Sequence, residues 1–530
     1  MELTTDAAST DICCLGAKHR LTPPRANGHL DRYTHAWSAL AAGTRSRLRG
    51  YWFAAAGAAA VALIAYVLTL APTITWHNGA LDSGDLATAV ITGGTPHPPG
   101  YPTYTLVGRG WVALPLGGDP AYRLSLLSAY GAASAAMLTG LTIARLGQRA
   151  GLERAPLTIG VFVGGLAVAL APLVWSQATV AEVYAPGLAV ISLLGWLLLG
   201  RSRPPFALAG LIGALGLGVL PEVGAAAPGA LALVLLRGRD GLARRLCRVC
   251  IASALGLCIF AYLPWSAAQQ PPFAWGDATT PPGFWQLVSV SQYQYLFRSL
   301  GPAESLGRLA EGLAALCENL GWIGLPAATF GAWALWRRER PALLYLLSLA
   351  GVTLAFRTSY LAEGNIRYLL PSLQVLALAA GLGVAEVLHH VRRTVSAIWL
   401  PLGLACVLLL LIRVPAVAPS VDARRDLRAD QFSRRALEEL PQGAIIVTDR
   451  DESTFSLWYR QALGQRLDVV VVDQNLLLHD WYRRRLAQNH PDLNPAALRQ
   501  GGLTALGRPV YLLAAPSGDV LPIPVALGRR

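Results

Sequence analysis

Long apolar runs constrain this 530-residue chain more than any other feature. A bilayer core about 30 Å thick needs roughly twenty apolar residues in a helix. By that measure the sequence predicts a multi-span α-helical membrane protein with about eleven spans. Its composition agrees, because 54% of the residues are hydrophobic and 14% are charged, whereas soluble domains carry roughly 25% charged residues. The predicted spans are 51–71, 122–144, 157–174, 183–199, 206–220, 224–236, 249–264, 314–336, 342–356, 368–388 and 397–414.

Arginine clusters orient these spans. They follow the even-numbered spans, and the positive-inside rule places such clusters in the cytoplasm. We therefore expect a multi-pass cell-membrane protein with a disordered cytosolic N-terminal tail over 1–48 and a transmembrane domain over 49–415. The same pattern accounts for the net charge of +13 without nucleic-acid binding. The clusters are Arg145, Arg149 and Arg154; Arg201 and Arg203; Arg237, Arg239, Arg244, Arg245 and Arg248; Arg337, Arg338 and Arg340; and Arg392 and Arg393.

The composition becomes that of a soluble protein from about Asp422 onward. Short runs of buried-strand type at 444–447, 468–472 and 510–512 alternate with segments of helical pattern. This alternation predicts a small α/β domain with a parallel sheet over 422–530. An odd number of spans places the domain on the extracytoplasmic side.

The first outer loop carries the leading candidates for chemistry. Asp82 and Asp85 flank Ser83-Gly84, and carboxylates three residues apart at a helix N-terminus are stabilised as anions. Such a pair could deprotonate an acceptor hydroxyl, orient an acceptor amide or hold a divalent cation. The alternative is ordinary helix capping. His97 and Tyr101 follow in a proline-rich segment that sets the backbone, where a structural histidine and an interfacial tyrosine are the alternatives.

The later outer loops add five candidates. Glu182 begins a span beside Tyr184, where an ionisable group is costly and indicates function unless it reaches the membrane surface. Trp275 lies in an aromatic loop that suits either sugar faces or a membrane surface. Arg357 and Arg367 lie on the side that is otherwise poor in arginine, so we expect at least one of them to bind a lipid-linked phosphate. Pairing with an acid or with lipid head groups is the alternative.

Four segments together resemble a known family. Two motifs are similar to the signature of the protein O-mannosyltransferase-like membrane family, within the GT-C glycosyltransferase superfamily. They are Asp82-Ser83-Gly84-Asp85 and the later His-Pro-Pro-Gly-Tyr-Pro over 97–102. Segments 175–184, 262–285 and 448–482 match the same pattern. The family usually has Glu where this chain has Asp85, which shortens the reach of that carboxylate.

The resemblance implies a GT-C fold and a membrane glycosyltransferase. Its expected reaction moves a sugar, mannose by this resemblance, from a polyprenyl-phosphate donor to a hydroxyl of a protein or envelope glycan at the outer membrane face. It implies Asp82 as the catalytic base, with Asp85 as its helper or as part of the acceptor site. Arg367 or Arg357 would stabilise the leaving phosphate. The other candidates, assigned to substrate binding, are His97, Tyr101, Glu182, Tyr184 and Trp275.

Two other classes of function compete with the enzyme. A multi-span transporter or lipid flippase usually shows internal repeats and charged residues inside its spans, and neither feature is visible here. A non-catalytic scaffold would use the outer domain to bind partners. No cluster of metal ligands in the sequence decides whether a divalent cation takes part.

Overall fold

The computed structural model describes residues 50–201, 203–237, 241–297, 300–321, 324–362, 364–493, 508–513 and 524–526. The expected cytosolic tail over 1–48 lies outside these residues. Residues 51–530 form one compact unit, so the C-terminal sheet is not separated from the membrane helices as an independent body.

Most of the predicted spans coincide with a helix. The first helix is Gly50–Val67. The others on the membrane side are α4 (Pro120–Arg149), α5 (Arg154–Ala169), α6 (Pro172–Ala178), α7 (Tyr184–Leu199), α8 (Phe206–Leu217), α9 (Ala227–Arg237), α10 (Leu242–Leu257), α13 (Pro302–Leu320), α14 (Gly324–Arg338), α15 (Arg340–Ser359), α16 (Leu370–Thr394), α17 (Trp399–Leu411) and α18 (Val414–Val421).

The expected number of eleven spans is not confirmed. In the described part of the chain, six helices are long and apolar enough to cross a membrane, or seven if the bent pair α5 and α6 counts as one span. Several apolar runs form shorter helices, such as α7 and α8. The prediction of one continuous helix over 314–336 is wrong, because α13 ends at Leu320 and α14 begins at Gly324. The coarser prediction of a multi-span helical membrane protein stands.

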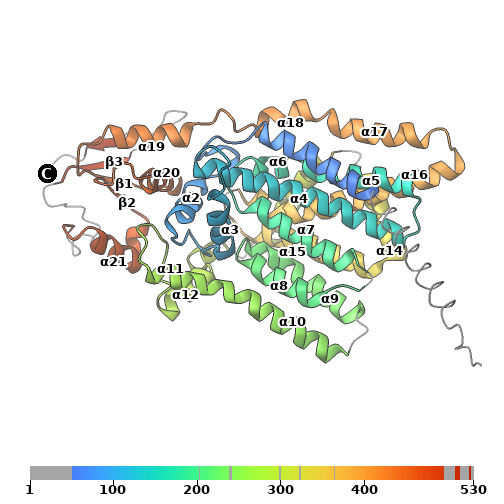
Figure 1. Ribbon diagram of the computed structural model, residues 1–530, viewed down its shortest axis with the longest axis horizontal. Helices are drawn as coiled ribbons and strands as arrows, with labels where there is room; N and C mark the ends of the chain where they lie inside the picture. The colour runs from blue at the N-terminus through green and yellow to red at the C-terminus, as the bar shows by residue number, and fades with distance from the viewer. Residues whose placement is uncertain are drawn as a thin grey trace, which may run out of the picture. The chain divides into compact units, whose positions relative to one another are not determined.

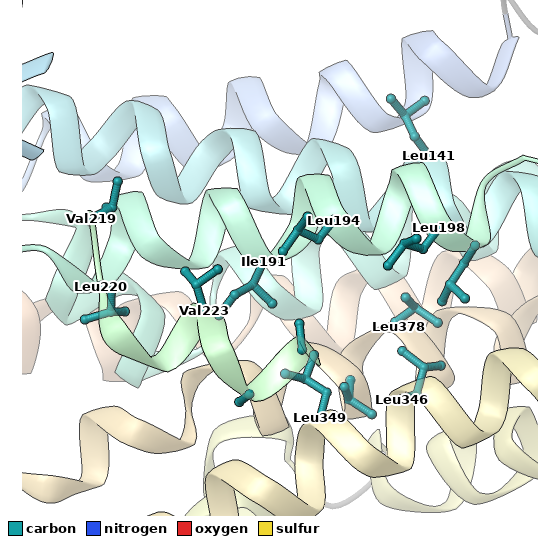
Figure 2. Close-up of a cluster of buried hydrophobic side chains, with 14 of the residues drawn as sticks. Leu141, Ile191, Leu194, Leu198, Val219, Leu220, Val223, Leu346, Leu349 and Leu378 are labelled. Carbon is teal, nitrogen blue, oxygen red and sulfur yellow. The ribbon is translucent and has the colours of Figure 1, made fainter. Parts of the chain in front are cut away.

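Leucine and valine side chains fill the space between the central helices. Figure 2 shows part of this core, where side chains from α4, α7, α15 and α16 meet those of the segment between α8 and α9. Small residues bring other helices together: a Cβ atom on Gly160 of α5 would lie 2.4 Å from the carbonyl oxygen of Gly381 on α16. Close backbone approach through small residues is typical of helix packing in membranes.

A four-stranded sheet forms the C-terminal part. Its order is β2 (Val470–Asp473), β1 (Ile445–Thr448), β3 (Val510–Leu513), β4 (Pro524–Ala526). The first three strands overlap the expected runs and pair in parallel, with Ile445 opposite both Val470 and Val510. Strand β4 was not expected and pairs antiparallel with β3. Strands β1 and β2 consist mainly of β-branched residues and are buried throughout, as befits strands covered on both faces.

Helices α19 (Arg428–Glu438), α20 (Asp451–Ala462) and α21 (Asp480–Asn489) accompany the sheet. Figure 1 shows α20 beside the short helix α2 (Ser83–Thr92), which comes from the first loop. Gly84 makes this contact close, because a Cβ atom there would lie 2.5 Å from the carbonyl oxygen of Phe455. The indole of Trp76 adds a hydrogen bond of 3.2 Å to the hydroxyl of Ser456. The C-terminal part therefore packs directly on the loop that carries Asp82 and Asp85.

Candidate active site

Asp82 occupies the residue before α2, where a capping carboxylate would be expected. Its side chain makes no capping hydrogen bond, and 31% of that side chain is exposed. It lines a cavity of about 530 Å³. Capping therefore does not occupy this carboxylate, which is left open toward the cavity.

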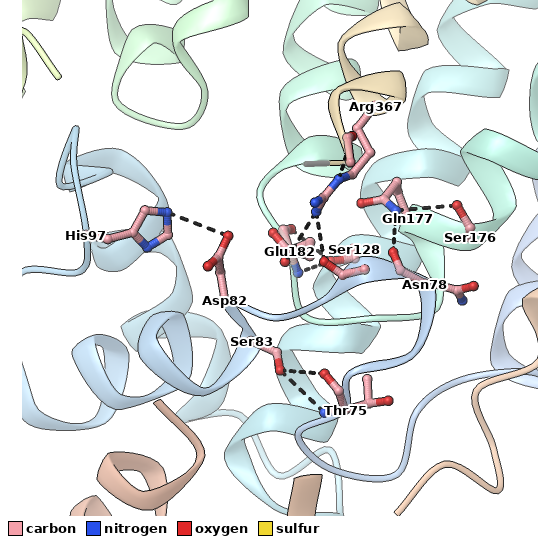
Figure 3. A network of polar contacts seen from close by, with 12 residues as sticks. Thr75, Asn78, Asp82, Ser83, His97, Ser128, Ser176, Gln177, Glu182 and Arg367 are labelled. Carbon is pink, nitrogen blue, oxygen red and sulfur yellow. Dashed lines mark hydrogen bonds and ion pairs between the residues drawn. The ribbon is translucent and has the colours of Figure 1, made fainter. Parts of the chain in front are cut away.

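His97 lies between two carboxylates. Its ring Nδ1 is 2.8 Å from Oδ2 of Asp85, and its backbone N–H donates to the same oxygen at 2.7 Å. On the other side of the ring, Nε2 is 3.8 Å from Oδ2 of Asp82 and 3.3 Å from the hydroxyl of Tyr101. Figure 3 shows the ring of His97 paired with Asp82. Asp85 is buried, whereas Asp82 faces the cavity, so the two carboxylates have different surroundings.

The carboxylates of Asp82 and Asp85 favour the protonated form of His97. Burial alone lowers the pKa of an imidazole. Here the negative charge of Asp82 and the hydrogen bond and charge of Asp85 outweigh burial and raise the pKa of His97 to about 9. The ring is therefore a cation at neutral pH, next to the Asp82 carboxylate.

Arg367 brings a second cation to the cavity from the short helix η5 (Asn365–Leu369). Its side chain is 11% exposed, and its Nη1 donates to the carbonyl of Gly79 at 3.0 Å. The guanidinium lies 4.9 Å from the ring centre of Tyr184 and 3.9 Å from Oε1 of Glu182 (Figure 3 shows the pair with Glu182). These contacts fix the position of the charge at the cavity wall.

Glu182 is almost completely buried, at 1% exposure. Its Oε1 has no hydrogen-bond partner in the described part of the chain, and the hydroxyl of Ser128 donates to its backbone carbonyl at 3.1 Å. Burial, followed by the charge of Asp82, raises the pKa of Glu182 to about 8. The side chain therefore lies behind the cavity wall rather than reaching the membrane surface.

The structure brings together most of the predicted site residues. Asp82, His97, Tyr101, Tyr184 and Arg367 line one cavity, with Asp85 and Glu182 directly behind it.

Two of the predicted site residues take other places. Trp275 is buried behind His97, with ring centres 6.4 Å apart, and supports the ring without lining the cavity. Arg357 is also not among the lining residues. Its Nη2 lies 3.2 Å from Oε2 of Glu311, and its Nη1 donates to the carbonyl of Arg308. The role of Arg357 as a phosphate ligand stays a prediction that this geometry does not favour.

Two carboxyl groups near the cavity are not among the site residues predicted from the sequence. Glu222 lines the cavity from the short helix η2 (Pro221–Ala226). Its signal was present, because it is the one charged residue between 206 and 236. Asp451 begins α20, and burial, with the charges of Asp473 and Asp82, raises its pKa to about 7. An acid in the first turn of a helix is so common that the sequence held no signal for Asp451.

No metal centre emerges from this arrangement. Among the described residues, no group of three or more His, Cys, Asp and Glu side chains could hold a metal ion. The chemistry that this cavity offers is that of an open carboxylate opposite a fixed guanidinium.

Two family models match the chain. The "Protein O-mannosyl-transferase TMEM260 N-terminal domain" matches residues 82–205, and "TMEM260-associated domain 2" matches residues 429–499. The first match begins at Asp82, and the second covers the segment from α19 through α21.

One relative and one solved structure extend these matches. Mouse (Mus musculus) protein O-mannosyl-transferase TMEM260 is 28% identical over an alignment of 476 residues. The alignment covers 82% of this chain and 65% of that protein, so the chain spans just under two thirds of the relative's length. The crystal structure of ArnT from Cupriavidus metallidurans bound to undecaprenyl phosphate has a TM-score of 0.50 at 14% identity, over 86% of this chain and 92% of that one. The latter likeness concerns the fold alone. The two domain matches and the mouse relative are similar to this chain in the same way as its sequence motifs, which resemble the protein O-mannosyltransferase-like family.

Proposed function

We propose that this chain is a membrane glycosyltransferase that moves a sugar from a polyprenyl-phosphate donor to a hydroxyl of a protein or envelope glycan. We expect the sugar to be mannose, as the name of the mouse relative and the motif resemblance suggest. The observation that carries the proposal is the placement of Asp82 and Arg367 on one cavity, a carboxylate open to an acceptor and a guanidinium suited to a phosphate.

The proposed reaction is a single displacement. Asp82 accepts the proton of the acceptor hydroxyl while the hydroxyl oxygen attacks the anomeric carbon of the sugar. A new glycosidic bond forms on the opposite face as the bond between the anomeric carbon and the phosphate oxygen breaks. The bonding electrons leave with the lipid phosphate, and Arg367 stabilises the charge that builds up there. The proton ends on Asp82 and is later released to solvent.

His97 and Asp85 act in this scheme by positioning. The imidazolium faces Asp82 at 3.8 Å and attracts its carboxylate. One oxygen of Asp85 accepts from both the ring Nδ1 and the backbone N–H of His97, and so holds the residue in place. The buried ring of Trp275 packs against His97 from behind. This arrangement keeps the base in place, while Asp85 itself stays buried outside the cavity.

The proposal includes an orientation and a division of the chain. We place the cavity and the part from 422 to 530 on the extracytoplasmic side of a membrane domain that extends from 49 to 415. The arginine pattern supports this orientation, because the clustered arginines follow alternate apolar runs.

A comparison of surface glycoproteins and glycans tests the proposal. Mass spectrometry is applied to cells that carry the chain, lack it, or carry Asp82→Asn. We expect hexose-bearing peptides or glycans that are present with the chain and lost in both other strains. A profile that is the same in all three would overturn the enzyme. Movement of labelled polyprenyl phosphate across the membrane of proteoliposomes, with no acceptor present, would instead favour a flippase.

A further inference from the structure

Glu222 lies at the break between two membrane helices. It follows Leu220-Pro221, where α8 has ended and α9 has not yet begun, and it faces the same cavity as Asp82 and Arg367. Its Oε2 is buried and has no hydrogen-bond partner in the part of the chain that the structure describes. The mechanism above leaves this carboxyl without a role.

A buried carboxyl oxygen without a partner is costly. Leaving water without gaining a hydrogen bond raises the free energy of the folded state, which is why such atoms in native proteins call for an explanation. Glu222 lies in an otherwise apolar stretch, where an alanine or leucine would avoid that cost. Because Glu222 also lines the cavity, a ligand there that donates hydrogen bonds to its carboxyl group would offset that cost.

Three tyrosines beside Glu222 indicate which kind of ligand this part of the cavity would bind. Tyr184, Tyr360 and Tyr368 line the cavity with Glu222. Their rings form a cluster: the ring centre of Tyr368 is 6.1 Å from that of Tyr184 and 5.7 Å from that of Tyr360, at interplanar angles of 62° and 63°. Tyrosine rings offer apolar faces with a polar edge, which suit the C–H faces and hydroxyls of a sugar ring.

The opposite charges of Glu222 and Arg367 favour different parts of one donor, the sugar and the phosphate. A carboxylate repels a phosphate but accepts hydrogen bonds from sugar hydroxyls, whereas the guanidinium of Arg367 has the opposite preference. Burial raises the pKa of Glu222 to about 7, against the opposing effects of its own backbone N–H and of Arg367. Near neutral pH the carboxyl group is therefore present in both forms, and it can accept from one hydroxyl and donate to another.

We propose that Glu222 and the tyrosines Tyr184, Tyr360 and Tyr368 form the subsite for the sugar of the lipid-linked donor, with Glu222 hydrogen-bonded to its ring hydroxyls. This subsite rests on the proposed function, because it assigns the sugar half of the same donor whose phosphate faces Arg367.

The test compares two lipids, one with the sugar attached to the phosphate and one without it. Binding of polyprenyl phosphate and of polyprenyl-phosphate-mannose is measured for the full chain in detergent, for Glu222→Gln, for Glu222→Ala and for the control Glu304→Gln, an exposed residue on α13. We expect the wild type and the control to bind the mannose-bearing lipid more tightly than the bare one. In Glu222→Ala the affinity for the mannose-bearing lipid falls about tenfold or more, the loss of one or two hydrogen bonds to a charged group. The affinity for the bare lipid does not fall, because Glu222 contributes no attraction to the phosphate, and this also shows that the variant is folded.

Other outcomes have distinct meanings. An unchanged affinity of Glu222→Ala for the mannose-bearing lipid, with the wild type active, would overturn the sugar subsite and leave the proposed function standing. A wild type that binds neither lipid would overturn the donor of the proposed function. If the Glu222 variants do not fold, donors whose mannose lacks one hydroxyl are compared on the wild type. Indifference to every single hydroxyl would then overturn the subsite.

Discussion

One carboxylate oxygen of Asp85 binds His97 twice, through the ring Nδ1 at 2.8 Å and through the backbone N–H at 2.7 Å. Asp85 is thereby turned away from the cavity that Asp82 lines. The geometry favours a positioning role for Asp85, in which it aims the ring of His97 at Asp82. A carboxylate with the shorter reach of aspartate is sufficient for that role.

We expect Asp85→Asn to lower kcat by about tenfold to a hundredfold with little change in the donor KM. The amide can still accept the backbone N–H bond, but it removes the charge that holds the imidazolium, so Asp82 is less well positioned. Transfer assays at varied donor concentration measure this split. An equally large rise in donor KM would show instead that Asp85 belongs to a donor-binding surface.

The raised pKa of His97 makes stability depend on pH. A histidine with a pKa of about 9 in the folded state and about 6.5 when unfolded contributes stability that is complete below about pH 6.5 and is lost as the pH rises through about 9. We expect the unfolding temperature of the wild type in detergent to fall between about pH 7 and 9.5. The unfolding temperature of His97→Gln should fall less over the same pH range. Glu182 and Asp451 also have raised pKa values, which act in the same direction. Both are present in the two proteins, so the difference between their profiles reports on His97. Parallel pH profiles of the two proteins would contradict a protonated His97.

The contact between α2 and α20 depends on Gly84. In Gly84→Ala the new Cβ would lie 2.5 Å from the carbonyl oxygen of Phe455, a backbone atom that cannot rotate away. We expect a loss of stability of about 1–3 kcal/mol and reduced transfer, because Asp82 directly precedes α2 and Asp85 lies on it.

The control for that variant is Gly110→Ala on α3 (Pro102–Val112), where nothing lies within 4 Å of the added Cβ. Replacing a glycine in an open helical position with alanine should maintain or raise stability. Thermal unfolding in detergent compares the two variants. Equal stability of Gly84→Ala and the wild type would mean that the C-terminal part does not pack on α2 as described.

Arg357 and Arg367 should respond differently to mutation. Arg367→Gln removes the guanidinium from the cavity wall, so we expect the affinity for polyprenyl phosphate to fall at least about tenfold. Arg357→Gln breaks the pair with Glu311 and should lower the unfolding temperature while leaving that affinity within about threefold of the wild type. The reverse result would assign the phosphate to Arg357.

Much of the architecture could be predicted because apolar runs report directly on membrane helices. Asp82, His97 and Arg367 could be singled out for a related reason: charged residues and rigid proline-rich loops are rare in an otherwise apolar chain. The break between Leu320 and Gly324 was missed because hydropathy continues across it.

The remaining site features depend on distant contacts. Arg357 resembled Arg367 in sequence, and only the fold shows that Glu311, 46 residues away, pairs with it. Glu222 was overlooked because a Pro-Glu pair beside glycines suggests a turn between helices, which it also is. Asp451 comes near Asp82 only through the packing of α20 on α2, a contact across more than 360 residues that no local pattern encodes.

The most direct test of the central claim is sugar transfer by Asp82→Asn in proteoliposomes. Labelled polyprenyl-phosphate-mannose and an acceptor protein are supplied to the wild type, to Asp82→Asn and to Asp480→Asn, a control whose side chain is 75% exposed on α21. Loss of a general base costs about 10²–10⁴-fold in rate, so Asp82→Asn should bind the donor lipid normally and transfer almost no label, while the control keeps full activity. Transfer by Asp82→Asn at the rate of the wild type would contradict the assignment of Asp82 as the base.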